Sequence, residues 1–303
     1  MGALVCELAG PWLAVREAER GERRGHARLR AAGAGPGRRL VFVDRVLVTL
    51  VVLRWALSHR VLAVLFGVSA STIDRAVAEI RPLLAARGFA APGRPGIRLR
   101  TLADVFACAE AEGITLRIDG TGIQVRRPRA KRPGRKAFIS GKKKQNTEKA
   151  TMISDGQGRG LWLGAVRPGR MHDVTAMRTE GIEERFRLHP SVKAEVDSGY
   201  TGSARDFPDQ VSAPPKKPAA DAGPSERNVY DHARHRQSQR RIMVEHANAD
   251  IKQWHCLQRR TGDRNDLPEA IAAIGSLVSD RSAKRPTHNN PGTELVLAHY
   301  TAC

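Results

Sequence analysis

Three acidic residues stand in sequence settings that could bring them to one site. Asp119 follows the alternating segment 114–118 and precedes Gly-Thr-Gly, and Asp197 follows the segment 191–196 and precedes Ser-Gly-Tyr. Glu245 lies in a segment with helical periodicity at 230–258. Clustered carboxylates repel one another unless a cation neutralises them, and such hard oxygen ligands suit Mg²⁺ or Mn²⁺. Two such ions could activate a water or a 3′-hydroxyl and stabilise the leaving oxygen of a phosphodiester.

Each acidic residue also has an ordinary structural interpretation. Aspartate beside glycine is common in turns, so Asp119 and Asp197 could be turn residues. At about 100° per residue, the helix predicted at 230–258 has an apolar stripe and a polar face. The stripe consists of Met243, Ala247, Ile251 and Trp254, and the polar face of Arg241, Glu245, Asn248, Lys252 and His255. That polar face is equally the pattern of a solvated helix with ion pairs between successive turns.

The segments around the acidic residues predict a mixed α/β fold. A strand from 114 should end at Asp119, turn at the glycines and return, and further strands are expected at 148–154, 160–167, 191–197 and 210–213. Helices are expected at 101–112, 174–188, 230–258 and 267–280. Because ligands in open α/β sheets gather at the carboxyl ends of strands, adjacent strands would bring Asp119 and Asp197 together. The helix that crosses this edge would add Glu245.

Residues 40–91 predict a small all-α domain with helices at 40–57, 59–66 and 70–87. Ala63 is small enough for two helices to cross, Gly67 permits the turn, and Ser69 can cap the last helix. This frame is similar to a helix-turn-helix, which would present the first turn of its last helix to DNA. The residues of that turn with suitable side chains are Ser71, Thr72 and Arg75. A plain three-helix bundle is the alternative.

The charge of the chain indicates a polyanionic partner. Lys and Arg number 51 against 31 Asp and Glu in 303 residues, a formal net charge of +20. Nucleic acid is favoured over an anionic membrane surface. Aromatic residues make up only 5% of the chain, which argues against a platform that stacks single-stranded bases. Lys142, Lys143 and Lys144 could hold a DNA backbone, although a charge run is equally a solvated loop.

The remaining segments carry fewer signals. We expect a basic, poorly ordered leader at 1–39 with a short helix near 12–24, a linker at 92–100 and a patternless tail at 281–303. Charged residues interrupt the apolar run 40–57, which predicts a core helix rather than a membrane span. The cysteines are too far apart for a zinc ribbon or disulfide framework, which favours a reducing cytosol and hence a cytoplasmic protein. When bound to DNA, such a protein would be associated with the nucleoid. They are Cys6, Cys108, Cys256 and Cys303.

Taken together, these blocks resemble the DDE transposases of bacterial insertion sequences over about residues 40–280. Asp-Gly-Thr at 119–121, Pro-Gly-x-x-His-Asp at 168–173 and Asp-Ser-Gly-Tyr at 197–200 are similar to the first and second blocks of that family. Arg241, Glu245 and Lys252 have the spacing of the third block, with Ser238 where the family often has tyrosine. Asp173 is also expected to cap the following helix, with His172 packed beneath the site.

The resemblance implies a ribonuclease H-like catalytic domain at 101–280 behind a helix-turn-helix domain at 40–91. Asp119, Asp197 and Glu245 would bind two Mg²⁺ or Mn²⁺ ions, and Arg241 and Lys252 would hold DNA phosphates. The implied activity is hydrolysis at transposon ends followed by attack of the 3′-hydroxyl on target DNA, by a homo-oligomer that binds terminal inverted repeats. A ribonuclease H-like nuclease without strand transfer and an inactive remnant that only binds DNA remain alternatives.

Overall fold

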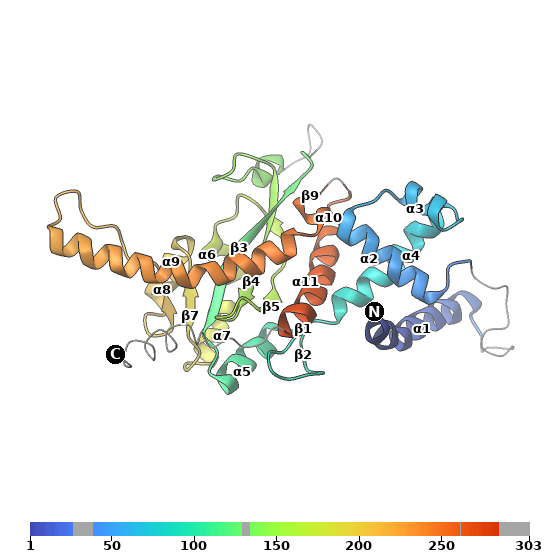
Figure 1. Ribbon diagram of the computed structural model, residues 1–303, viewed down its shortest axis with the longest axis horizontal. Coiled ribbons are helices and arrows are strands. Elements are labelled where there is room, and N and C mark those ends of the chain that lie inside the picture. Colours follow the sequence, from blue (N-terminus) through green and yellow to red (C-terminus); the bar gives the residue numbers. More distant parts are fainter. Residues whose placement is uncertain (27–38, 129–133, 261, 285–303) are drawn as a thin grey trace, which may run out of the picture.

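The computed structural model describes residues 1–26, 39–128, 134–260 and 262–284, with the side chains at 239–241 also left undescribed. A helical N-terminal part lies beside a mixed sheet that is flanked by helices (Figure 1). The predicted fold class, α/β with an all-α domain before it, is confirmed.

The helix-turn-helix part consists of three helices close to the predicted bounds. They are α2 (Phe42–Trp55), α3 (His59–Leu65) and α4 (Ala70–Ala86). Val48, Leu62 and Ile73, one from each helix, are buried against one another. Gly67 has φ +61°, the left-handed conformation that glycine adopts without a steric penalty, and so permits the turn between α3 and α4.

The leader is ordered over more residues than expected: the short helix expected near 12–24 is the second half of a longer helix, and the expectation of poor order before it is wrong. Residues Gly2–Arg24 form helix α1, and Leu8 is buried in the core. Trp12 lies 4.8 Å from Phe42 between ring centroids and donates a hydrogen bond to Glu79 at 3.1 Å. The basic composition of the segment hid an apolar stripe at helical spacing, formed by Leu4, Val5, Leu8 and Trp12. Residues 27–38 and the tail beyond 284 lie outside the described residues.

The central sheet has the strand order β5-β4-β3-β7-β8. Its strands are β3 (Leu116–Val125), β4 (Thr147–Ser154), β5 (Gly160–Leu163), β7 (Ala194–Val196) and β8 (Val211–Ser212). The β3-β4-β5 part is antiparallel, whereas β7 and β8 run parallel to β3. The short strands β6 (Arg167–Pro168) and β9 (Arg259–Arg260) pair with β4 and β3. This order and these directions are those of a ribonuclease H-like sheet.

The turn predicted after Asp119 does not exist. Strand β3 runs without interruption through both glycines, with Asp119 opposite Met152 and Gly122 opposite Lys149. Gly120 is used for close approach rather than for a turn, since a Cβ atom there would lie 3.2 Å from Asp173 Oδ1. Asp119 therefore lies inside a strand, one residue past the last parallel pair of β3 with β7.

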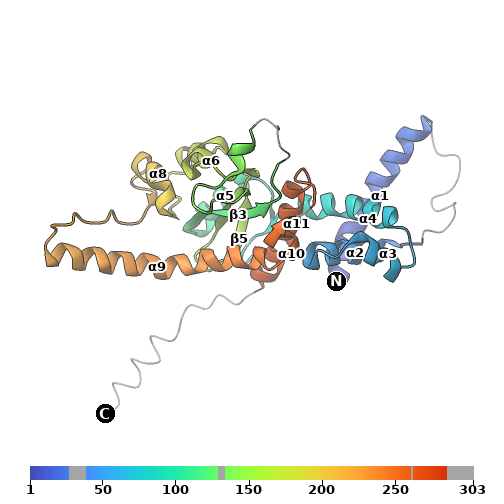
Figure 2. The same cartoon turned by 90° about the horizontal axis from the view of Figure 1, so that it is seen from above.

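Helices cover both faces of the sheet (Figure 2). On one face Ile118 and Ile153 pack with Phe106 of α5 (Leu102–Glu112) and Phe186 of α7 (Ile182–Leu188). On the other face, buried side chains of β3 and β4 pack with α9 (Pro224–Lys252), α10 (His255–Gln258) and α11 (Leu267–Ala283). The single helix predicted at 174–188 is two helices, α6 (Asp173–Thr179) and α7, because Gly181 has φ +75° between them.

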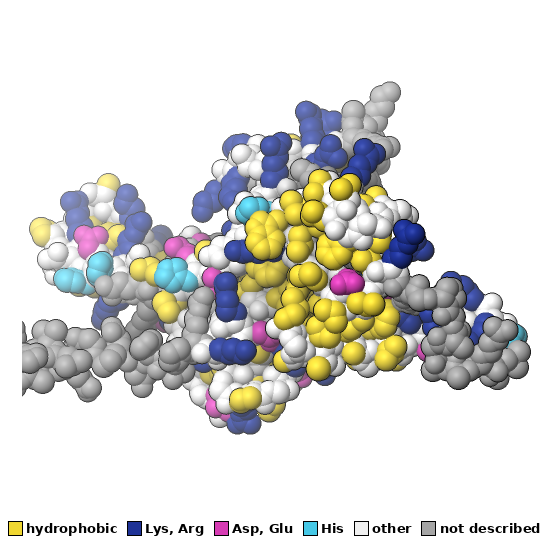
Figure 3. Space-filling model, turned by 45° about the vertical axis from the view of Figure 1, so that its right-hand side comes forward, with side chains coloured by type: hydrophobic (Ala, Val, Ile, Leu, Met, Phe, Trp, Pro, Cys, Tyr) yellow, Lys and Arg dark blue, Asp and Glu magenta, His cyan; other side chains and the backbone are white. Residues whose placement is uncertain are grey.

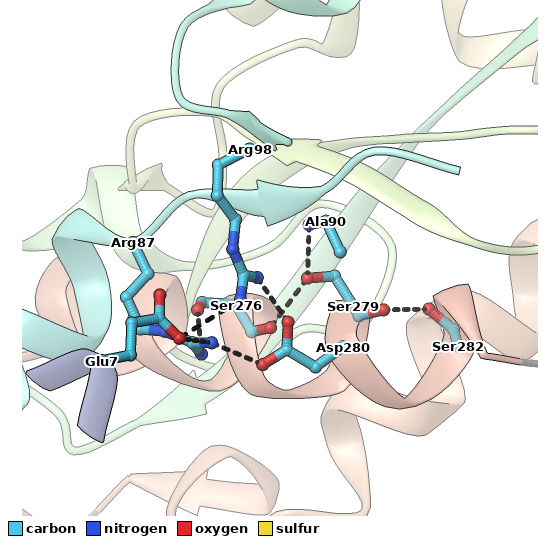
Figure 4. Close-up of polar contacts among 8 residues, drawn as sticks. All are labelled: Glu7, Arg87, Ala90, Arg98, Ser276, Ser279, Asp280 and Ser282. Atoms are coloured by element: carbon cyan, nitrogen blue, oxygen red, sulfur yellow. Dashed lines mark hydrogen bonds and ion pairs between the residues drawn. The ribbon is translucent and has the colours of Figure 1, made fainter. Parts of the chain in front are cut away.

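The segment expected to be a linker at 92–100 is docked on the C-terminal helix. Strands β1 (Phe89–Ala90) and β2 (Arg98–Leu99) form a small hairpin with Phe89 and Leu99 buried. Beside it, Arg87 donates 2.7 Å hydrogen bonds to Glu7 of α1 and Asp280 of α11, and Arg98 also bonds Asp280 (Figure 4). The Pro-Gly-Arg-Pro-Gly segment at 92–96 is the hydrogen-bonded turn of this hairpin, in which residues 93–96 are exposed.

Helix α4 also packs along α11, which joins the helix-turn-helix part to the sheet. Ile80 and Leu84 of α4 share a buried cluster with Ile271 and Ile274 of α11. At the edge of this contact Arg81 pairs with Glu269 at 3.0 Å and with Asp266 at 3.1 Å. The two DNA-facing parts predicted from the sequence therefore share one helix–helix interface.

Within the described ranges, no helix on its own has the length and apolar character to cross a membrane. The pair α3 and α4 meets these criteria together, but is bent by 106° at the break between the two helices.

Candidate active site

Asp119 and Asp197 lie together where β3 and β7 run side by side. The last parallel pair is Ile118 with Val196, and each aspartate follows it directly. Both aspartates line one narrow cavity beneath helix α9. Its other lining residues are Arg117, Ile118, Glu195, Val196, Gln237 and Val244. The meeting of two aspartates expected from the sequence is therefore present.

The two carboxylates are held by short hydrogen bonds. Asp197 Oδ1 accepts from the backbone N–H of Ser198 at 2.6 Å, at the start of the 3₁₀ helix η2 (Ser198–Tyr200). Asp119 Oδ1 accepts from the N–H of Gly120 at 2.8 Å, and its Oδ2 accepts from Asn248 Nδ2 at 2.9 Å. Helix α9 is thereby tied to the first aspartate through a side chain.

Glu245 lies on the same helix but on its exposed side. The residue before it, Val244, and the residue one turn after it, Asn248, are both buried toward the sheet. Glu245 is absent from the lining of the aspartate cavity. In the part of the chain that is described, no three His, Cys, Asp or Glu side chains are grouped closely enough to hold a metal ion. The assignment of Glu245 as third ligand stays a prediction.

Asn248 is a residue whose place the sequence pattern did not reveal. We expected it on the polar face, yet its side chain is 6% exposed and contacts Asp119. The buried side of α9 is centred on Val244, Ala247, Asn248 and Ile251, rotated from the predicted stripe. Ala247 and Ile251 of the predicted stripe are buried, and Trp254 packs against the same core. Met243 is only partly buried, and Val244 and Asn248, which the predicted stripe left out, are buried instead. Among described residues, Asn248 Oδ1 has no hydrogen-bond partner.

Lys252 approaches the same site from the end of α9. Burial lowers the pKa of Lys252, the charge of Lys143 lowers it further, and Asp119 acts in the opposite direction. Lys143 is exposed, as are Lys142 and Lys144 beside it in the connection from β3 to β4. Lys143 and Lys252, both predicted to hold DNA, are therefore near enough for the charge of Lys143 to affect Lys252. The side chain of Arg241 is not among those that the structure describes.

Beneath the aspartates lies a buried tyrosine, Tyr200, which is 1% exposed. Burial raises the pKa of Tyr200, and the negative charges of Asp173 and Asp119 raise it further. Asp173 accepts a hydrogen bond from Lys149 Nζ at 2.6 Å instead of capping α6, whose N-cap residue is His172. His172 is exposed, so the expectation that it packs beneath the site is wrong.

The residues predicted to contact DNA lie at the start of α4. Ser71 and Arg75 are exposed and Thr72 is partly buried. Ser69 is the N-cap residue, but its hydroxyl contacts those of Ser71 and Thr72, both at 2.9 Å, and makes no cap bond to the backbone. Arg75 donates to the carbonyl of Ser71 at 3.1 Å, which holds its guanidinium beside that first turn.

Lys and Arg side chains gather in groups around a broad hydrophobic area on one side of the molecule (Figure 3). Exposed basic residues of the β3–β4 connection include Arg126, Arg127 and Lys142–Lys144. Exposed apolar side chains on α2 and α3 include Leu47, Val64 and Leu65.

The segment that contains Asp119, Asp197 and helix α9 matches a known protein family. The family model described as DDE superfamily endonuclease matches residues 118–278, more than half of the chain. The chain belongs to the DDE superfamily endonucleases. A second model, the helix-turn-helix of DDE superfamily endonuclease, matches residues 38–90 and confirms the predicted helix-turn-helix. The first match begins one residue before Asp119 and includes Asp197 and Glu245.

A search of curated proteins finds no match. Among solved structures, the chain is similar to a Mos1 transposase paired-end complex with the left transposon end at 13% identity, covering 89% of this chain and 86% of that one. A mariner Mos1 paired end complex with Mg matches at 14% identity, covering 87% and 86%. The TM-score is 0.20 in both cases, so the assignment to the superfamily rests on the family models.

Proposed function

We propose that this DDE superfamily endonuclease is a DNA transposase that hydrolyses a phosphodiester at transposon ends and then transfers the freed 3′-hydroxyl to target DNA. The observation that carries the proposal is the meeting of Asp119 and Asp197 on adjacent parallel strands beneath α9, the helix that carries Glu245. This arrangement occurs within the segment that matches the endonuclease family model.

The two aspartates fit a hard divalent cation, because Asp119 and Asp197 line one cavity and carry the carboxylate oxygens that Mg²⁺ and Mn²⁺ prefer. Asp119 and Asp197 would hold the metal, and Glu245 would be the third ligand, in a site of two ions. When bound, the metal supplies charge neutralisation and activation of the attacking oxygen.

The cationic side chains have a separate task in this proposal. Lys252, beside Asp119 and partly buried, would hold a phosphate near the scissile bond, and Arg241 would hold another. Lys142–Lys144 would contact the DNA backbone without reading its sequence. The basic chain, at +20, is suited to long DNA contacts.

The first turn of α4 would recognise the terminal inverted repeats through Ser71, Thr72 and Arg75. Two ends must be brought together for transfer, so we propose a homo-oligomer on double-stranded DNA. Its place of action would be the cytoplasm, on nucleoid DNA.

The testing experiment measures Mn²⁺- or Mg²⁺-dependent nicking of labelled DNA that carries the element's own ends. We expect wild type to nick the DNA and Asp197→Asn to lose more than about 10³-fold of the rate, since removing a ligand removes metal-assisted chemistry. Asp206→Asn is the matched control, because Asp206 pairs with Arg178 on the surface at 2.8 Å. It should nick like wild type.

The products then separate the alternatives. Joined donor–target products would establish strand transfer, whereas nicking without joining would identify a nuclease. If wild type binds the ends but never nicks them, the proposal is wrong and the chain is a DNA-binding remnant.

A further inference from the structure

The carboxylate of Asp173 lies between the two segments that carry the predicted catalytic aspartates. A Cβ atom added to Gly199, two residues after Asp197, would lie 2.6 Å from Asp173 Oδ2. A Cβ atom added to Gly120, the residue after Asp119, would lie 3.2 Å from Asp173 Oδ1. One oxygen of Asp173 thus packs against each backbone. A side chain at Gly199 would collide with it, and a side chain at Gly120 would crowd it.

The charge of Asp173 is balanced from the neighbouring strand. Lys149 of β4 donates from Nζ to Asp173 Oδ1 at 2.6 Å, and only 14% of its side chain is exposed. Partly buried ion pairs of this kind are costly to break, because one partner is left without its counter-charge. The pair therefore fixes Asp173 against β4 as well as against the two glycine segments.

The glycines themselves are not required by backbone conformation. Neither Gly120 nor Gly199 has a positive φ in the left-handed region, so alanine is permitted there as far as the backbone is concerned. The barrier to a side chain at either position is contact, above all with Asp173. The two positions share a close contact with Asp173, not a strained backbone conformation.

We propose that Asp173 is a positioning residue that sets the separation of Asp119 and Asp197, with Lys149 neutralising its charge. Asp173 acts through the two aspartates by filling the space between Gly120 and Gly199. This inference rests on the proposed function, since it assigns the spacing of that metal site.

The test compares three variants by Mn²⁺ binding, measured from the electron paramagnetic resonance signal of free Mn²⁺, and by Mn²⁺-dependent nicking. In Gly199→Ala the new methyl group must displace Asp173, and in Asp173→Ala the space is left unfilled. Each should weaken Mn²⁺ binding about tenfold, the effect typical of losing support for a metal ligand.

The double variant Gly199→Ala/Asp173→Ala gives the decisive result. The Cβ atoms of the two residues would be 3.5 Å apart, an ordinary packing distance that refills the space. We expect it to bind Mn²⁺ more tightly than Gly199→Ala alone. If Asp173 were itself a metal ligand, the double variant would be at least as weak as either single variant, and the inference would be wrong.

Gly122→Ala is the control, because Gly122 is on the same strand as Gly120 and has nothing within 4 Å of an added Cβ. It should bind Mn²⁺ like wild type. If Gly199→Ala does not fold, Gly120→Ala, with its milder 3.2 Å contact, replaces it in the same comparison. A wild type that neither binds Mn²⁺ nor nicks DNA would overturn the proposed function. If wild type does both, but the double variant binds Mn²⁺ no more tightly than Gly199→Ala, only the positioning role of Asp173 is overturned.

Discussion

At the scale of single residues, Asp119 is held by an amide from another element. Its Oδ2 accepts from Asn248 on α9, although Asn248 was expected among solvated residues. A neutral amide beside a carboxylate can orient it without competing charge. Asn248 therefore links the position of the helix to the direction of the first aspartate.

Asn248→Leu removes this hydrogen bond while keeping a side chain of similar size. A hydrogen bond to a charged group contributes about 1.5–3 kcal/mol, so we expect Mn²⁺-dependent nicking to fall at least about tenfold. DNA binding in EDTA should be unchanged. Ala249→Leu, at an exposed position of the same helix, is the control. Equal nicking by Asn248→Leu and wild type would show that Asp119 needs no such restraint.

At the scale of elements, a glycine in the turn between β4 and β5 allows α9 to lie close to the sheet. Gly158, between β4 and β5, has φ +74°, and a Cβ atom there would lie 2.5 Å from the carbonyl oxygen of Met243. Met243 immediately precedes Val244 and Glu245. The close approach of this turn thus sets how near α9 comes to Asp119 and Asp197.

Gly158→Ala should therefore affect both stability and nicking. The left-handed φ costs about 1 kcal/mol for alanine, and the contact with Met243 adds to it by pushing α9 outward. We expect a lower melting temperature and a rate of nicking reduced at least about fivefold, as in other small displacements of catalytic groups. Gly96→Ala carries a similar φ of +84° with nothing nearby, and should lose stability without losing nicking beyond its folded fraction.

The sequence predicted the bounds of helices and strands better than the long-range contacts between them. Helices α2, α3, α4, α5 and α11 and strands β4 and β7 were expected close to their bounds, because their periodicity is strong and local. The continuous strand through Asp119 was missed, because glycine usually signals a turn. Here Gly120 serves a contact with Asp173, which lies 53 residues downstream in the chain. Long-range contacts of this kind leave no periodic signal.

The same holds for the candidate site: residues in sequence motifs were predicted, and residues brought in by strand pairing were not. The family resemblance selected Asp119, Asp197 and Glu245, and the strands place the first two together. Lys149 and Tyr200 could not be found by spacing, since their roles depend on which strands are neighbours. The sequence did carry one signal for the role of Asp173. A glycine follows each aspartate within two residues, and glycines in such places can leave room for a third side chain that packs against both segments.

At the scale of the whole molecule, the first helix, the hairpin and the last helix meet at one polar cluster. Arg87 is buried, and its guanidinium bonds Glu7, Asp280 and Ser276 (Figure 4). The hydrogen bond from Arg87 is the main cause that lowers the pKa of Glu7 below its ordinary value of 4.5. Ionised Glu7 therefore contributes stability above about pH 4.5 that is lost as the pH falls through the lowered value.

Glu7→Gln tests this contribution. At pH 7 the variant should be less stable than wild type by about 1 kcal/mol, the scale of a partly exposed charge-assisted pair. The difference should shrink as the pH falls below 4.5 and Glu7 of wild type becomes neutral. Thermal unfolding across pH measures it, with Glu19→Gln, an exposed partner of Arg16, as the control. A difference that is constant with pH would contradict the assignment.

The packing of α4 along α11 has a consequence for the DNA substrate. The helix that would read the terminal repeat is joined to the sheet that would cut it by a buried interface and by the ion pairs of Arg81 and Arg87, not by a slack tether. If one subunit both reads and cuts an end, the number of base pairs between the repeat and the nick is a property of the protein. Inserting about half a helical turn of DNA, roughly 5 base pairs, would turn the scissile phosphate to the opposite side of the duplex, whereas a full turn would restore its helical phase.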